Sequence, residues 1–229
     1  MNSTNLASQL HAGQQRINQA CERFARKYNN VQLVGASKTK PAADIRTLYN
    51  LGLMHFGENY LKEAITKQAS LKDLEISWHF IGQIQSNKTK LIAENFNWVH
   101  GVDRFKIAKR LSEQCPTDKT LNIFLQINLD NEASKAGIAP KEAMTLAKQF
   151  IELPNLSLRG LMALPQARNS FNEQKACFLT LKSLQTDINQ ALGIRMDTIS
   201  AGMSNDLEAA IAAGSTMVRI GTDLFGARP

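Results

Sequence analysis

The sequence is poor in cysteine and has no long apolar run. Its three cysteines, Cys21, Cys115 and Cys177, lie far apart and form no CxxC pair, so we expect neither a disulfide framework nor a thiolate zinc site. Cysteine used in this way is typical of a reducing cytosol. The first residues, MNSTNLASQLHAGQQ, are too polar for a secretory signal, and no stretch reaches the roughly 20 apolar residues of a membrane span. We therefore expect a cytoplasmic protein without a membrane partner.

A surface for nucleic acid is also missing. The net charge of +7 is compatible with nucleic acid, an anionic membrane or a phosphorylated small molecule. The basic residues are scattered along amphipathic segments, however, and no platform of aromatic and basic side chains accompanies them. We expect no nucleic-acid partner and, since no long apolar surface patch is evident, a monomer.

What the sequence does contain is an alternation of short apolar runs with amphipathic segments. The first thirty residues favour a helix, which we expect to cover one end of the structure, because Leu10, Ile17 and Phe24 recur at helical spacing. Further helices lie between the later apolar runs, one of them expected to begin with Asp103 as its N-cap. The predicted strands are Gln32–Ser37, Leu53–Phe56, Ser77–Phe80, Trp98–Gly101, Leu121–Asn128, Ser157–Met162, Met196–Ser200 and Thr216–Ile220.

Eight β/α units in one chain, with no linker rich in proline or glycine, predict an α/β fold, a single (β/α)8 TIM barrel. The barrel is expected over residues 31–229 and an additional N-terminal helix over residues 1–30, together one domain over residues 1–229. An open doubly wound sheet is the alternative. It requires a glycine-rich phosphate-binding turn after the first strand, and the sequence Ala36-Ser37-Lys38-Thr39 offers none.

Lys38 follows the first predicted strand, at the end of the barrel where such folds carry their active sites. Continuing the alternation of Val34 and Ala36, its side chain is expected to face the barrel interior. Partial desolvation there favours the neutral amine, which can attack a carbonyl. A lysine paired with a carboxylate at the rim is the alternative, and the local sequence does not separate the two.

Arg219 lies within Met217-Val218-Arg219-Ile220, a strand too apolar to hold an unpaired guanidinium. A buried ion pair with an aspartate or glutamate would satisfy it, and so would a ligand at the barrel mouth. Its position at the end of the eighth predicted strand favours the ligand.

A phosphate site is predicted after strands seven and eight, where such barrels commonly bind phosphate near helix N-termini. Gly202-Met203-Ser204 leads into a helix with Ser204 as the expected N-cap, and Gly221-Thr222 follows the eighth strand. Lys38 and this phosphate site would contact the two opposite ends of one ligand. Pyridoxal phosphate (PLP), an aldehyde that carries a phosphate, fits the pattern. A phosphorylated sugar fits it too, so a Schiff-base aldolase stays open.

His55, His79 and His100 fall on three successive predicted strands. No HxH pair occurs and carboxylate partners are not evident, so packing or hydrogen bonding is favoured over metal ligation. We expect no metal site.

Six segments carry a resemblance to a known family: VGASKTKP, HFGENY, WHFIGQIQSNK, VHGVDR, GLMAL and GMSNDLEAAIAAGSTMVRIGTDLFGAR. They run in order over residues 31–228 and resemble the pyridoxal phosphate homeostasis protein family, whose barrel is similar to the N-terminal domain of alanine racemase. The sequence departs from the commonest family pattern at Ala201 and Gly101.

The resemblance implies a PLP site and assigns roles within it. Lys38 would carry the cofactor as a Schiff base and Arg219 would face the pyridine nitrogen. Ser204, Gly221 and Thr222 would hold the phosphate. The residues placed at the cofactor in this way are Lys38, Asn59, Met203, Ser204, Arg219, Gly221 and Thr222.

The family also implies a function: binding, buffering and delivery of PLP, with apo forms of PLP enzymes as recipients. A guanidinium beside the pyridine nitrogen keeps that nitrogen unprotonated and weakens the ring as an electron sink. Alanine racemase uses a second acid/base from a separate domain, whereas this sequence ends at Pro229, directly after the predicted barrel. We therefore expect little or no catalysis and assign no catalytic residue. The alternative is a PLP-dependent amino-acid racemase.

Overall fold

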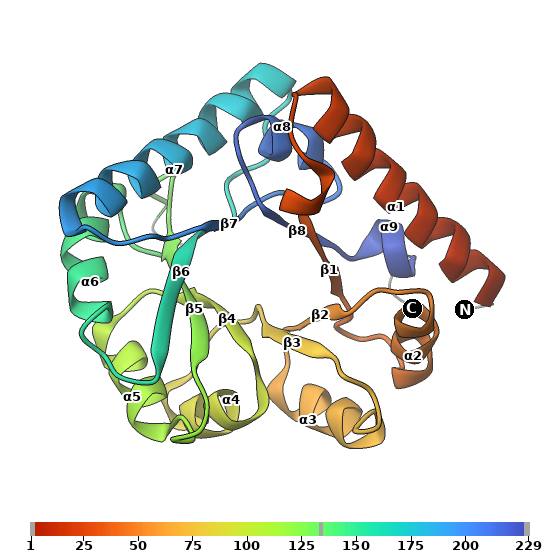
Figure 1. Cartoon of the computed structure of the whole chain (residues 1–229), viewed down its shortest axis with the longest axis horizontal. Helices are drawn as coiled ribbons and strands as arrows, with labels where there is room; N and C mark the ends of the chain where they lie inside the picture. The colour runs from red at the N-terminus through yellow and green to blue at the C-terminus, as the bar shows by residue number, and fades with distance from the viewer. Residues whose placement is uncertain (1–2, 133–134, 227–229) are drawn as a thin grey trace.

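The computed structural model describes residues 3–132 and 135–226, in which eight parallel strands close into a barrel in chain order (Figure 1). The first strand pairs with both the second and the eighth. The (β/α)8 prediction is confirmed, and the open sheet is excluded. The strands are β1 (Gln32–Ala36), β2 (His55–Glu58), β3 (Ser77–Phe80), β4 (Trp98–Val102), β5 (Leu121–Ile127), β6 (Leu156–Ala163), β7 (Thr198–Ser200) and β8 (Met217–Ile220).

Helices surround the barrel as an outer ring (Figure 1). They bury their apolar faces against the outside of the strands, as their spacing predicts. In the described residues the helices are α1 (Ser3–Arg23), α2 (Ala42–Asn50), α3 (Leu61–Ser70), α4 (Thr89–Asn95), α5 (Phe105–Gln114), α6 (Ala143–Phe150), α7 (Phe171–Leu192), α8 (Leu207–Ala212) and α9 (Thr222–Phe225), with short 3-10 turns at Tyr28–Asn30, Ser86–Lys88 and Pro140–Glu142.

The expected N-terminal helix is present and ends at Arg23, whereas Met1 and Asn2 lie outside the described residues. Its expected position was wrong. Instead of covering an end of the barrel, α1 packs in the outer ring against α8, α9 and α2 (Figure 1, red). The helix lies against β8 at Gly13, where a Cβ would make an ordinary contact of 3.7 Å with the Ile220 side chain.

All eight predicted strands exist; β3 has its predicted ends, Ser77–Phe80, and the other seven are shifted at one end or both. The largest shift is at β2, predicted at Leu53–Phe56 and found at His55–Glu58. The Leu53 N–H still belongs to the end of α2, because it donates to the Leu48 carbonyl at 3.0 Å. At the other end the strand extends through Glu58, which is fully buried despite its charge.

Asp103 does not cap α5, so that prediction was wrong. Arg104 occupies the N-cap position. The Asp103 carboxylate instead pairs with the Arg104 guanidinium at 2.9 Å and accepts the Gly137 N–H at 3.4 Å. These two contacts turn the carboxylate away from the first helical N–H groups.

The core has two layers. The outer layer, between strands and helices, is apolar and includes Phe56, Leu111 and Phe150. The barrel interior mixes the apolar cluster of Val34, Phe124, Met162 and Met217 with the buried side chains of His79, His100 and Arg219. None of the described helices combines the length and the hydropathy that crossing a membrane requires.

Candidate functional site

The structure gathers the predicted residues of β1, β7 and β8 on one continuous part of the barrel rim. Strand β1 lies beside β8, with Val34 opposite Arg219. A Cβ on Gly221 would lie 3.5 Å from the Cβ of Ala36, two residues before Lys38. On the other side of β8, the Arg219 N–H donates to the Gly202 carbonyl at 3.0 Å. Lysine and phosphate loops are therefore neighbours.

Lys38 is a half-buried residue of a tight turn that follows β1. The Lys40 N–H closes the turn by donating to the Ser37 carbonyl at 3.0 Å. Thr39 adopts a positive φ of 63°, which is uncommon for a β-branched residue and needs support from its surroundings.

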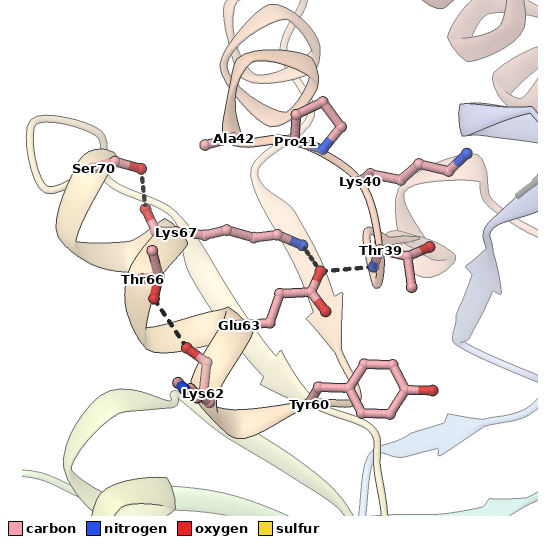
Figure 2. A pocket seen from close by; sticks show the side chains of 10 residues that line it. All are labelled: Thr39, Lys40, Pro41, Ala42, Tyr60, Lys62, Glu63, Thr66, Lys67 and Ser70. Carbon is pink, nitrogen blue, oxygen red and sulfur yellow. Dashed lines mark hydrogen bonds and ion pairs between the residues drawn. The ribbon is translucent and has the colours of Figure 1, made fainter. Parts of the chain in front are cut away.

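A charged cluster supplies that support (Figure 2). The Lys67 ammonium donates to the Ser37 carbonyl at 2.7 Å and lies 2.6 Å from a Glu63 carboxylate oxygen. The same oxygen accepts the Thr39 N–H at 2.7 Å. Both neighbours of Lys38 are thus tied to helix α3, which fixes the backbone from which Lys38 extends.

Glu58 completes the cluster beneath the turn. It accepts from the Lys67 ammonium at 2.7 Å and from the Ser37 hydroxyl at 2.6 Å. Burial raises the pKa of Glu58, while the hydrogen bonds from Lys67 and Ser37 oppose that rise. Its second carboxylate oxygen is buried and has no hydrogen-bond partner among the described residues.

Lys67 is the other buried amine beside the turn, and the cluster disqualifies it as a nucleophile. Its three N–H groups are all used, on Ser37, Glu58 and Glu63. The Lys40 ammonium points elsewhere, donating to the Gly226 carbonyl at 3.2 Å. Lys38 itself extends from the pinned turn at the carboxyl end of β1, on the rim where a ligand is expected.

Asn59 follows β2 on the same rim. Its side-chain oxygen is buried without a hydrogen-bond partner in the described part of the chain, a state that a bound donor would relieve. The residue borders a cavity of about 860 Å³ at the carboxyl ends of β2 to β6, together with Gly101, Gln126 and Met162. Of the residues predicted at the cofactor, Asn59 is the one that lines this cavity.

The loops predicted to bind phosphate follow β7 and β8, and the helix after the first of them has a different cap from the predicted one. Asp206, not Ser204, is the N-cap of α8, and its carboxylate accepts the Met203 N–H at 2.6 Å. The Ser204 prediction as N-cap was wrong because the chain makes one more turn before the helix begins. The N–H groups of Ser204 and Thr222 have no backbone acceptor within residues 3–132 and 135–226.

Arg16 of α1 ties the two loops together, a contact that sequence reasoning missed. Its guanidinium donates to the Ser204 carbonyl at 2.8 Å, to Glu208 of α8 at 2.9 Å and to Asp223 of α9 at 2.9 Å. The N-terminal helix therefore contacts the loop after β7 through the Ser204 carbonyl and the segment after β8 through the Asp223 side chain.

Arg219 is buried, and no described carboxylate forms an ion pair with it. Its guanidinium donates to the Ser200 hydroxyl and, at 3.2 Å, to the Ala163 carbonyl. Burial lowers the pKa of Arg219 to about 10, and the nearby Asp206 carboxylate opposes that shift. Three of its five N–H donors remain for a ligand, which favours the ligand interpretation over the buried ion pair.

The three histidines form hydrogen bonds with one another inside the barrel, so the hydrogen-bonding prediction is confirmed. His79 lies 2.9 Å from both His55 and His100. Burial lowers the pKa of all three and does so most strongly for His79 and His100. Burial therefore favours the neutral form of each ring.

Known proteins match this barrel over nearly its whole length. Residues 9–229 match the family described as alanine racemase, N-terminal domain. A pyridoxal phosphate homeostasis protein of Pseudomonas aeruginosa is 55% identical over 214 residues, which are 93% of this chain and 91% of that protein. One of Haemophilus influenzae is 46% identical over 228 residues, 98% of this chain and 96% of that protein.

Among solved structures, PipY of Synechococcus elongatus with PLP bound superposes with a TM-score of 0.84 at 34% identity. The match covers 96% of this chain and 100% of that chain. These matches define the class as alanine racemase N-terminal barrels. Within it, the chain belongs to the pyridoxal phosphate homeostasis protein family, which confirms the resemblance seen in the sequence. The last family segment ends at Arg228, which lies outside the described residues.

Proposed function

We propose that this chain binds PLP at the barrel mouth, with the aldehyde held as a Schiff base on Lys38. The family relatives are named for PLP homeostasis, and the PipY structure contains PLP. The observation that carries the assignment is the turn of Lys38, pinned on both sides by the cluster of Lys67 and Glu63. Bound PLP supplies an aldehyde to the amine and a phosphate to the loops across the rim.

The other contacts of the cofactor follow from the same arrangement. The buried side-chain oxygen of Asn59 would accept a hydrogen bond from the cofactor. Ser204 and Thr222 would hold the phosphate, because their N–H groups have no backbone acceptor among the described residues, and Met203 and Gly221 would lie beside it. Arg219 would face the pyridine nitrogen.

The biological role we propose is to buffer PLP and deliver it to apo forms of PLP enzymes. The protein would act in the cytoplasm, as a single-domain monomer. Its three buried cysteines are free thiols, as expected in a reducing compartment. We propose little or no catalysis, because a cationic Arg219 at the pyridine nitrogen weakens the ring as an electron sink.

The Lys38 assignment is tested by reducing the PLP-loaded protein with borohydride and locating the adduct by mass spectrometry. We expect the adduct on the peptide that contains Lys38, and its loss together with the visible absorbance band in Lys38→Ala. Lys40→Ala is the matched control, two residues along the same turn, and should keep both. Retention of the adduct in Lys38→Ala would show that another amine holds PLP.

The low catalysis is tested separately. A panel of amino acids is incubated with the PLP-loaded protein in heavy water, and exchange of the α-proton is followed by NMR. We expect exchange far below ordinary enzyme rates of roughly 1–1000 per second. Exchange within that range would instead favour the racemase alternative.

A further inference from the structure

A continuous chain of polar side chains runs through the interior of the barrel. His55 Nδ1 lies 2.9 Å from His79 Nε2, His79 Nδ1 lies 2.9 Å from His100 Nε2, and His100 Nδ1 lies 2.9 Å from the Ser200 hydroxyl. The Ser200 oxygen in turn accepts from Arg219. Four links therefore connect His55 to the guanidinium.

The two ends of this chain lie at opposite ends of the barrel. His55 is the first residue of β2 and lines a cavity of about 470 Å³ among other residues that begin strands, including Gln32, Trp98 and Met217. Arg219 belongs to the rim where the strands end. The chain thus crosses the barrel from its amino end to the proposed PLP site.

Aromatic side chains hold the imidazole rings in place. His79 stacks on Trp98, with ring centroids 5.5 Å apart and an interplanar angle of 7°. His100 packs against Phe124 at 4.6 Å. Both histidines are completely buried. Barrels of this type are usually filled with branched apolar residues. Polar side chains in the same place cost free energy of folding unless their hydrogen bonds are complete.

Hydrogen-bond chemistry gives the chain a direction. A guanidinium can only donate, so the Ser200 oxygen accepts from Arg219. The arrangement that also uses the Ser200 hydroxyl as a donor directs its hydrogen to His100 Nδ1. A neutral imidazole has one donor and one acceptor. His100 therefore donates from Nε2 to His79, and His79 donates from Nε2 to His55. The Nε2–H of His55 then faces the cavity at the amino end.

We propose that Ser200, His100, His79 and His55 are positioning residues that fix the Arg219 guanidinium toward the pyridine ring of PLP. The inference rests on the proposed function for the role of Arg219. The directional chain keeps the Ser200 oxygen, rather than its hydrogen, toward Arg219. The position of the proton on one ring fixes which nitrogen of the neighbouring ring carries a proton. A change at His55 therefore reaches Arg219, four links away.

The chain itself is tested on the protein without PLP, labelled with 15N-histidine. We expect scalar couplings across two N–H···N hydrogen bonds, one between His100 and His79 and one between His79 and His55, with the proton on Nε2 of every donor ring. Missing couplings, or protons on Nδ1, would overturn the proposal. Since no PLP is present, that failure is distinct from a failure of PLP binding.

The positioning role is tested by the side-chain Nε–H resonance of Arg219 in the same PLP-free protein. Ser200→Ala should shift and broaden this resonance, and Ser200→Thr, which keeps the hydroxyl, should restore it. His55→Leu should shift it in the same direction by less. His11→Leu removes an exposed histidine outside the chain and should leave it unchanged.

With PLP bound, 15N-labelled in its pyridine ring, Ser200→Ala should also shift the pyridine resonance and release PLP about ten-fold faster. An Arg219 resonance that is the same in wild type and Ser200→Ala would overturn the positioning role. So would a His55→Leu variant indistinguishable from His11→Leu.

Discussion

The two ends of the proposed PLP site are built in different ways. At the lysine end, buried side-chain charges hold the turn of Lys38, with Lys67 bonded to Glu58 at 2.7 Å and to Glu63 at 2.6 Å. At the phosphate end, short loops offer backbone N–H groups, and the nearest ionic support comes from Arg16 on a separate helix. One end depends on a buried ionic cluster, and the other depends on backbone shape.

The difference follows from what each end has to do. A lysine that forms a covalent bond needs a fixed backbone, and buried charges in a low-dielectric setting supply strong, specific contacts. A phosphate brings its own charge, so its loops need only unused N–H donors. We expect variants at the lysine end to change the stability of the protein, and variants at the phosphate end to change PLP retention.

The largest effect is expected for Lys67→Met. Removing the ammonium leaves the buried Glu58 carboxylate without its cation, and breaking a buried pair in this way costs about 3–5 kcal/mol. The free energy of unfolding, measured by urea denaturation, should fall by about that amount. Lys90→Met is the control, because Lys90 and Glu94 form an exposed pair at 3.9 Å. It should show no measurable change.

The loss of stability in Lys67→Met should depend on pH. Glu58 has a pKa above its ordinary value in the folded protein, so the folded state binds more protons and stability falls as the pH rises through that pKa. Without Lys67 the pKa rises further. The deficit should therefore be largest at mildly alkaline pH and shrink toward mildly acidic pH. A deficit that is constant over this range would show that Glu58 is not responsible.

An intermediate effect is expected for Ser204→Ala at the phosphate end. Loss of one hydrogen bond to a charged phosphate should weaken retention of PLP by about 1.5–3 kcal/mol, with unfolding nearly unchanged. The rate of PLP release to an excess of trapping apo-enzyme measures this. Ser204→Thr keeps the hydroxyl and should retain PLP. A Ser204→Ala variant that releases PLP at the wild-type rate would show that Ser204 does not contact the phosphate.

The smallest effect is expected for Arg16→Gln. Arg16 contacts Ser204, Glu208 and Asp223 but is one-third exposed, so its loss should change stability by less than about 1 kcal/mol. PLP release should become a few-fold faster, because the two loops lose their common anchor. Arg46→Gln is the control. Arg46 lies on α2, away from these loops, and its guanidinium also contacts a carboxylate, that of Asp73, and a carbonyl, that of Ser70. Equal release from the two variants would contradict the anchoring role.

Much of this architecture could be read from local patterns. Short apolar runs that alternate with amphipathic segments predicted all eight strands. The pattern is local because the residues of each strand are themselves buried. Lys38, Ser204 and Thr222 could be placed on the rim because parallel strands end on one side of a barrel. The ends of β2 could not be placed in this way. The predicted strand stopped at Phe56, short of Glu58, whose burial depends on its ion pair with Lys67 of α3.

The missed residues share one physical cause. Arg16 and Asp223 are 207 positions apart in the chain, so no local pattern relates them. Glu63 and Lys67 have the i, i+4 spacing of an ion pair on one helix, a signal that indicated a pair but not its place beneath Lys38. The helix caps were misplaced because Asp103 is held by Arg104 and Gly137, and because an extra turn after Ser204 moves the N-cap of α8 to Asp206.

The sequence by itself determined the barrel, the family and the identity of the rim residues, because periodicity, strand order and family motifs are all local properties of the chain. Only the tertiary structure decided which side chains meet. It placed Lys67 under the turn of Lys38 and Arg16 across both phosphate loops, and it joined His55, His79 and His100 into one chain that ends at Arg219. Barrel closure makes these contacts, since it brings the first and eighth strands together and directs alternate side chains to a common interior.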